Sequence, residues 1–252
     1  MKIIEDIVYS KVANEELVLD LFLPDEGAFD VFVYYHGGGL EKGSHKGAEK
    51  FANYLCEHGI AVASVKYRMY PTHAYPDFLV DAANAVKFVS DNIKNYGECK
   101  GIFVGGSSAG GYMSMMLCFD KRWYEGAGVD KKLIAGYVHD AGQPTAHFNV
   151  LKFSGVDPRR VIVDETAPLY HIGTDTEYPP MTFIVSDEDM QNRYEQTMLV
   201  LSTLKHFGHT EPKITHTVMH GKHCKYVGRI DEEDGLSAFG KLIEAFVTSV
   251  KE

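Results

Sequence analysis

Cysteine is scarce in this chain of 252 residues, which contains only four. Their spacing does not match a metal site, and four in a chain of this length are too few for a disulfide framework. We therefore expect reduced thiols. Long apolar runs are also missing near the N-terminus, where Glu5 and Asp6 follow the first four residues. The sequence thus predicts neither a signal peptide nor a membrane anchor. We therefore expect a cytoplasmic location.

Positive charge is in short supply as well. The 25 lysines and arginines are outnumbered by 35 aspartates and glutamates, and the formal net charge is -10. A nucleic acid or an anionic membrane needs a basic face on its protein partner, so both partners are excluded. We expect a small-molecule substrate, and the sequence leaves homo-oligomerisation open.

The chain has ordinary globular composition, with 45% hydrophobic and 24% charged residues. Its length fits one large domain spanning residues 1–252. Short apolar runs at 30–35, 60–65, 101–104, 133–138, 181–185 and 214–218 alternate with helical patterns at 50–57, 78–96, 112–117, 194–207 and 236–250. Strands that are apolar on both faces belong in a sheet covered by helices. The pattern predicts an α/β fold with a mostly parallel central sheet.

Two segments depart from this rhythm. Residues 16–23 alternate in polarity, which is typical of an edge strand with one wetter face. Residues 143–180 are irregular and rich in proline, and we expect them to form a small lid or cap insertion over the active face.

A glycine-rich corner follows the apolar run at 101–104. The sequence GGSSAGG fits the pattern G-x-S-x-G, with Ser108 at its centre between Gly106 and Gly110. A serine on a tight strand-to-helix turn needs such small neighbours, because the turn brings strand and helix close together. The backbone N–H of Ala109 would face the same space. Alone, the pattern is also typical of ordinary loops.

A second glycine run, His-Gly-Gly-Gly at residues 36–39, follows the apolar run at 30–35. Successive glycines let backbone N–H groups approach a substrate, so Gly37 and Gly38 are candidate donors to a developing oxyanion. His36 is expected to bond to backbone and hold the loop. Two glycine runs, each directly after a predicted strand, indicate a nucleophile with oxyanion donors more specifically than either run alone.

These two motifs, together with HGIAVASVKYRM at 58–69, resemble the α/β-hydrolase superfamily, specifically the hormone-sensitive-lipase-like and feruloyl-esterase-like carboxylesterases. The resemblance covers about residues 30–226. It implies an α/β-hydrolase fold, a serine nucleophile at Ser108 and an oxyanion hole made by Gly37, Gly38 and Ala109. One departure is Leu40, where these enzymes usually carry an aromatic residue, and it leaves the shape of the acyl pocket open.

A serine hydrolase of this fold needs an acid and then a histidine downstream of the serine. Asp187, Glu188 and Asp189 follow the predicted strand 181–185, at the end where open α/β sheets bind ligands. The family pattern, in which the acid follows the strand after a short turn, matches Asp189. Asp187 is the alternative.

The chain has twelve histidines, so composition alone identifies no base. The family's glycine-x-histidine pattern falls on Gly221 and His223, after the last predicted strand, which makes His223 the expected catalytic base. His220 is expected to end that strand. Cys224 does not lie on a tight strand-to-helix turn and has no separate base, which disfavours a cysteine nucleophile.

The sequence as a whole predicts a serine carboxylesterase that forms an acyl-enzyme on short-chain esters, and the family resemblance alone adds acetylated or feruloylated carbohydrates as candidate substrates. No metal-ligand cluster is visible, so no metal and no cofactor are expected. Two alternatives stay open. One is an amide-type acyl hydrolase such as an arylformamidase or a peptidase, which would use the same triad, and the other is a non-catalytic receptor or scaffold of this fold.

Overall fold

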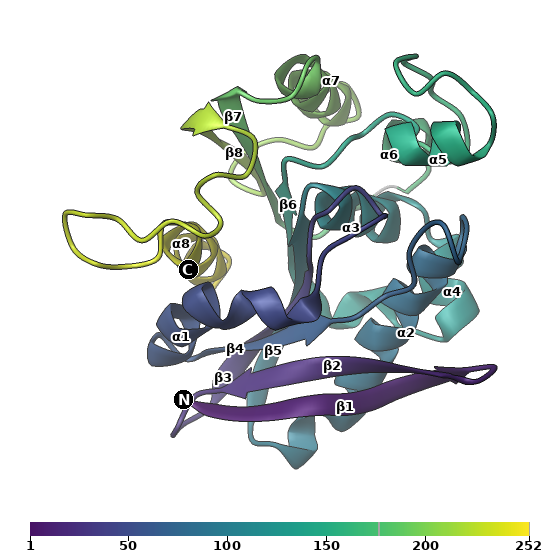
Figure 1. Cartoon of the computed structure of the whole chain (residues 1–252). Helices are drawn as coiled ribbons and strands as arrows, with labels where there is room; N and C mark the ends of the chain where they lie inside the picture. The colour runs from purple at the N-terminus through teal and green to yellow at the C-terminus, as the bar shows by residue number, and fades with distance from the viewer. Residues whose placement is uncertain (176, 252) are drawn as a thin grey trace.

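A single mixed sheet organises the computed structural model, which describes residues 1–175 and 177–251 (Figure 1). Within these ranges the strands are β1 (Lys2–Val12), β2 (Glu15–Leu23), β3 (Phe29–Tyr35), β4 (Ile60–Val65), β5 (Cys99–Ser107), β6 (Ile134–Asp140), β7 (Met181–Glu188) and β8 (Ile214–Lys222). They are ordered β1-β2-β4-β3-β5-β6-β7-β8. Strand β2 pairs antiparallel with β1 and β4, and all the other neighbours are parallel. The predicted mostly parallel α/β sheet is confirmed.

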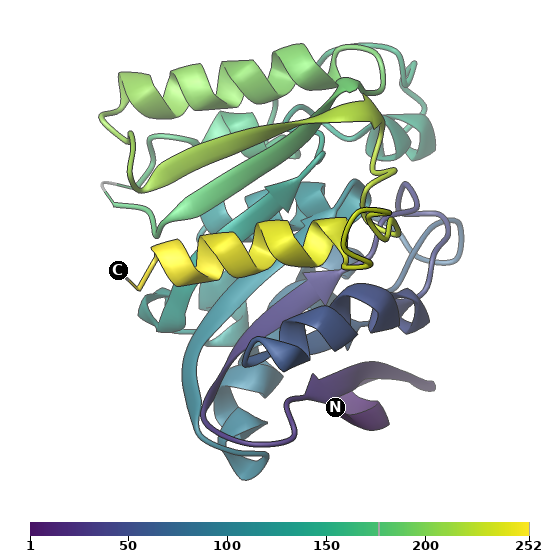
Figure 2. The same ribbon diagram turned by 90° about the vertical axis from the view of Figure 1, so that its left-hand side faces the viewer.

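Helices cover both faces of this sheet. They are α1 (Glu49–Glu57), α2 (Asp77–Asn92), α3 (Ala109–Phe119), α4 (Arg122–Ala127), α5 (Phe148–Phe153), α6 (Pro168–His171), α7 (Arg193–His206) and α8 (Ala238–Ser249), with short 3-10 turns η1 (His45–Ala48), η2 (Ile93–Asn95) and η3 (Lys131–Leu133). Helices α1 and α8 lie together on one face (Figure 2), and α2 and α3 cover the other. In the part of the chain that is described, no helix combines the length and the apolar character that crossing a membrane requires.

Strand β3 shows why the central strands lack alternation. Val31, Val33 and Tyr35 pack into the core shared with α2 and α3. Phe32 and Tyr34 point the opposite way, into the core shared with α1 and α8. Because side chains alternate between faces and both faces are covered, every position of β3 is buried.

The N-terminal edge of the sheet differs from the prediction. The sequence does not predict strand β1, because most of its side chains are exposed or half-buried and Tyr9 is its one buried residue. Strand β1 pairs with β2 and takes the edge position of the sheet, so the prediction that residues 16–23 form an edge strand is wrong. The supposedly wetter face of β2 carries Asp20, which is only 1% exposed and bonds to the ammonium of Lys46.

Two further segments are more ordered than expected. Strand β8 continues through His220 to Lys222, so His220 does not end it. The segment 143–180 contains the short helices α5 and α6, which lie beyond the carboxyl end of β6 (Figure 1).

Candidate active site

The turn between β5 and α3 holds Ser108 in a strained conformation. Its backbone has φ 56° and ψ -109°, a region that residues other than glycine rarely adopt. A Cβ at Gly106 would lie 2.5 Å from the carbonyl oxygen of Tyr35, and one at Gly110 only 1.9 Å from it. Both glycines are therefore required, because β3 passes directly against this turn. Ser108 is half-buried and lines a cavity above the sheet.

His223 connects this serine to a buried carboxylate. Its Nε2 lies 2.8 Å from Oγ of Ser108, and its Nδ1 lies 2.5 Å from Oδ1 of Asp189. The Asp189 side chain is 0% exposed and also accepts the backbone N–H groups of Ser186 and Met190. The ends of β5, β7 and β8 thus bring together the three residues that the sequence predicts as nucleophile, acid and base.

Two opposing effects act on the pKa of Asp189. Burial raises it, whereas the hydrogen bond from His223 and the backbone N–H groups lower it more, so the net pKa lies below the ordinary value. Asp189 is a carboxylate at neutral pH. The Asp189 carboxylate accepts Nδ1–H of His223, which leaves Nε2 free to accept a proton from Ser108.

The neighbouring carboxylates of the cluster lie outside this arrangement. Asp187 accepts a hydrogen bond from Nδ1 of His220 at 2.8 Å and one from the N–H of Gly221 at 2.8 Å. The His220 side chain is 88% exposed, and Glu188 is exposed as well. A second histidine–aspartate pair thus lies at the surface, away from Ser108.

The glycine loop after β3 lies against the serine. A Cβ at Gly37 would be 3.2 Å from the Cβ of Ser108, so the backbone at Gly37 closely approaches that residue. Gly38 has φ 119°, and its carbonyl oxygen accepts the N–H groups of Glu41 and Lys42. This turn needs glycine, since a Cβ at Gly38 would lie 1.8 Å from the carbonyl oxygen of Lys42.

Two further residues of this loop, His36 and Leu40, are held by contacts within the protein. His36 stacks on Tyr67 with ring centroids 4.5 Å apart, and its Nδ1 lies 2.7 Å from the carbonyl oxygen of Gly37. Burial lowers the pKa of His36 to about 4, so the ring is neutral and holds the loop as expected. Leu40 is fully buried in the core shared with α2 and α3, so the missing aromatic is replaced by a core side chain.

A buried polar layer beneath the serine was not predicted from the sequence. The carbonyl oxygen of Asp140 accepts the N–H of Ser108 at 2.8 Å, and its carboxyl group accepts the hydroxyl of Tyr226. Burial raises the pKa of Asp140 to about 6, although hydrogen bonds from Ser107 and Tyr226 act against this rise. The position of Asp140 at the end of a strand is the feature of the sequence that could have indicated this role. The predicted strand, however, stops two residues earlier.

Cys224 lies close to the histidine but is unsuited to act as a nucleophile. Its Sγ is 3.7 Å from Nε2 of His223. Burial, together with the negative charges of Asp140 and Asp189, raises the pKa of the thiol well above its ordinary value. The group stays a neutral thiol, which is a weak nucleophile.

A cavity of about 620 Å³ opens over Ser108 and His223. Its walls are formed by Tyr34, Gly37, Gly38, Gly39, Glu41, Lys42, Ser107, Ser108, Phe148, Asn149, Met190, His223, Cys224 and Val227. Helix α5 supplies Phe148 and Asn149, and Nδ2 of Asn149 donates to the carbonyl oxygen of Gly39 and to Glu41. The segment 143–180 therefore shapes the cavity and is bonded to the glycine loop.

Comparisons with known proteins agree with this geometry. A family model described as BD-FAE matches residues 19–156, more than half of the chain. The chain is 34% identical over 94 residues to an AB hydrolase superfamily protein of Schizosaccharomyces pombe, and 35% identical over 106 residues to the carboxylic ester hydrolase LipN of Mycobacterium tuberculosis. These matches cover 36% and 40% of this chain but only 28% of each relative. A solved thermophilic esterase of Thermogutta terrifontis with bound propionate has the same fold, with a TM-score of 0.78 at 19% identity over 98% of this chain and 94% of that chain.

Proposed function

The chain belongs to the BD-FAE family, and from that premise we propose that it is a serine carboxylesterase working through an acyl-enzyme. The observation that carries the proposal is the line of contacts from Ser108 through His223 to Asp189, with separations of 2.8 Å and 2.5 Å. The esterases among the similar proteins support the same class of reaction.

In the first half of the reaction, Oγ of Ser108 attacks the ester carbonyl carbon while Nε2 of His223 takes the hydroxyl proton. Asp189 holds Nδ1–H and stabilises the imidazolium. The carbonyl oxygen becomes an oxyanion, and the backbone N–H groups of Gly37, Gly38 and Ala109 donate to it. Collapse breaks the bond to the alcohol oxygen, and that oxygen takes the proton from His223.

In the second half, water attacks the acyl-serine and gives a proton to Nε2 of His223. The second tetrahedral intermediate collapses, the proton returns to Oγ of Ser108, and the carboxylic acid leaves. The charge of Asp189 is needed in both halves, because the imidazole becomes cationic twice.

The cavity supports a preference for short acyl chains. Glu41, Lys42 and Asn149 contribute polar groups to its lining, and Phe148 and Met190 contribute apolar surface. The similar Thermogutta terrifontis esterase has been solved with propionate and with butyrate bound. We infer that this chain also hydrolyses esters of small acids, acetylated or feruloylated carbohydrates among the candidates.

Ser108→Ala tests the proposal directly. We expect this variant to lose ester hydrolysis and to keep its fold, because it removes one hydroxyl from a partly exposed turn and no core atoms. A fluorophosphonate probe should label the wild-type protein at Ser108, as mapped by peptide mass spectrometry, and should leave the variant unlabelled.

Ser90→Ala is the matched control. Ser90 lies on α2, and its hydroxyl donates to the carbonyl oxygen of Lys87 in the same helix. This variant should keep both hydrolysis and labelling. Wild-type turnover by a folded Ser108→Ala protein would exclude the serine mechanism.

A further inference from the structure

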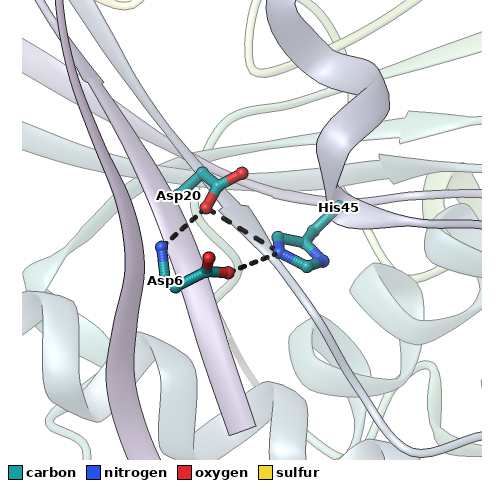
Figure 3. Close-up of side chains that lie close together, drawn as sticks. All are labelled: Asp6, Asp20 and His45. Atoms are coloured by element: carbon teal, nitrogen blue, oxygen red, sulfur yellow. Dashed lines mark hydrogen bonds and ion pairs between the residues drawn. The ribbon is translucent and has the colours of Figure 1, made fainter.

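A bulge in β1 brings together three side chains of types that can bind a metal ion, none of which lines the cavity over Ser108 (Figure 3). The pairing of β1 with β2 shifts register between Ile4 and Ile7, and Asp6 within this bulge has φ 54°. Its carboxylate faces Asp20 of β2 and the imidazole of His45 in η1. Such strain in a residue other than glycine is characteristic of functional sites.

The imidazole of His45 is aimed between the two carboxylates without a hydrogen bond to either. Its Nε2 is buried and has no hydrogen-bond partner among the described residues, and the residue is 8% exposed. The distances from Nε2 to Oδ1 of Asp6 and of Asp20 are 3.6 and 3.7 Å. Both distances exceed the length of an N–H···O hydrogen bond, so a proton on Nε2 would form no good hydrogen bond to either carboxylate.

A cation already lies at the point where the carboxylates converge. The ammonium of Lys46 is 3.0 Å from Asp20 Oδ1, 3.2 Å from Asp6 Oδ1 and 3.0 Å from Glu5 Oε1. Three carboxylates and one ammonium leave two negative charges uncompensated when the imidazole is neutral. A divalent ion would compensate the cluster better than a single ammonium does.

We propose that Asp6, Asp20 and His45 bind a divalent transition-metal ion of the zinc class, which displaces the ammonium of Lys46. Their ligand atoms lie within 4.8 Å of one another. In a tetrahedral site with bonds of about 2.0–2.1 Å the ligand atoms are about 3.3 Å apart, so shifts of a few tenths of an ångström bring Nε2 into place.

The chemistry of the donors selects the class of metal. An imidazole with two carboxylates suits zinc, cobalt or nickel, whereas magnesium and calcium prefer oxygen ligands alone. Glu5 or a water molecule would complete the fourth position. The sequence predicts no metal site, because these donors are far apart along the chain and only the β1–β2 register and η1 bring them together.

The bound ion would join the edge of the sheet to the segment that follows the glycine loop. The carbonyl oxygen of His45 accepts the hydroxyl of Ser64 at 2.6 Å, so η1 is also attached to β4. A ligand that binds only the folded protein raises its stability. The site therefore acts as a structural clamp on β1, β2 and η1.

Titration of the purified, metal-free protein with Co²⁺ tests the site, because tetrahedral Co²⁺ absorbs visible light and reports its own coordination. We expect one Co²⁺ per chain with this absorption, and displacement by Zn²⁺. His45→Gln should weaken binding by at least about tenfold, because it removes a ligand. Lys46→Met should strengthen it by about tenfold, because the competing ammonium is lost.

His220→Gln is the matched control, because it removes another imidazole that pairs with an aspartate, here at an exposed position. It should bind Co²⁺ as the wild type does, and Zn²⁺ should raise the Tm of this control but not of His45→Gln. Binding that is equal in His45→Gln and wild type, or lost in His220→Gln, would overturn the site. Equal affinity in Lys46→Met and wild type would overturn the displacement of the ammonium. Circular dichroism without metal establishes that each variant is folded.

Discussion

Asp187 and Asp189 are chemically equivalent and lie two positions apart, yet their surroundings differ. Asp189 is enclosed and bonds to His223, whereas Asp187 is 43% exposed and bonds to His220. Loss of the orienting carboxylate leaves the histidine in the wrong tautomer. We therefore expect Asp189→Asn to lower kcat on an activated acetyl ester by about four orders of magnitude.

Asp187→Asn is the comparison variant in the same assay. It removes a surface pair that does not reach Ser108, so kcat should stay within a few-fold of the wild-type value. The opposite ranking of the two variants would assign the orienting role to Asp187.

Asp140 predicts a pH dependence of stability. Burial raises its pKa from 3.8 to about 6, so between these values the folded protein holds a proton that the unfolded chain releases. Its contribution to stability is therefore present below about pH 4 and is lost as the pH rises to about 6. A difference of about two pKa units corresponds to about 3 kcal/mol.

Asp140→Asn removes this titration and nearly preserves the shape of the side chain. We expect the free energy of unfolding of the wild type, measured relative to this variant by urea denaturation, to fall by about 3 kcal/mol between pH 4 and pH 7. Parallel curves for the two proteins would show that Asp140 titrates normally.

The strand-to-helix turn makes a prediction about whole elements. A Cβ at Gly110 would meet the backbone oxygen of Tyr35 at 1.9 Å, and neither β3 nor α3 can yield without disturbing the core on both sides. Gly110→Ala should therefore lower the free energy of unfolding by about 3 kcal/mol and reduce hydrolysis with it.

Gly126 supplies the control for this substitution, because it lies in α4 with no atom within 4 Å of an added Cβ. Gly126→Ala should leave stability unchanged or raise it by up to about 1 kcal/mol, through its helix propensity. Chemical denaturation of both variants checks the pair, and equal stabilities would mean that the turn is less crowded than its geometry indicates.

At the scale of the whole molecule, charge and cavity together predict substrate size. A net charge of -10 disfavours adsorption to anionic lipid surfaces, and the lining of the cavity of about 620 Å³ includes the polar groups of Glu41, Lys42 and Asn149. Extra methylene groups improve binding only where apolar surface receives them. We expect kcat/KM to be highest for acetyl to butyryl esters and to fall for longer chains.

A series of p-nitrophenyl esters from acetyl to decanoyl measures this preference, with acetylated and feruloylated sugars as further substrates and a matched amide as a comparison. A maximum at decanoyl, or activation by a lipid–water interface, would show that the cavity opens into a larger apolar cleft. Hydrolysis of the amide in preference to the ester would favour the amide-hydrolase alternative.

The sequence by itself determined the features that depend on neighbouring residues. Buried strands are apolar at every position because both faces are covered, and β3 is an example. The turns at Ser108 and Gly38 need glycine for φ angles or close approach, so their motifs are visible without a structure. These local requirements were enough to predict the fold class and to single out Ser108 as the candidate nucleophile.

Only the tertiary structure decided which distant side chains meet. The choice between Asp187 and Asp189 depends on how the ends of β7 and β8 are aligned, because a shift of one residue reverses the side-chain direction. The place of Asp140 beneath Ser108 depends on where β6 ends beside β5. Spacing along the chain does not encode strand register, so contacts between the ends of different strands become visible only when the sheet is assembled.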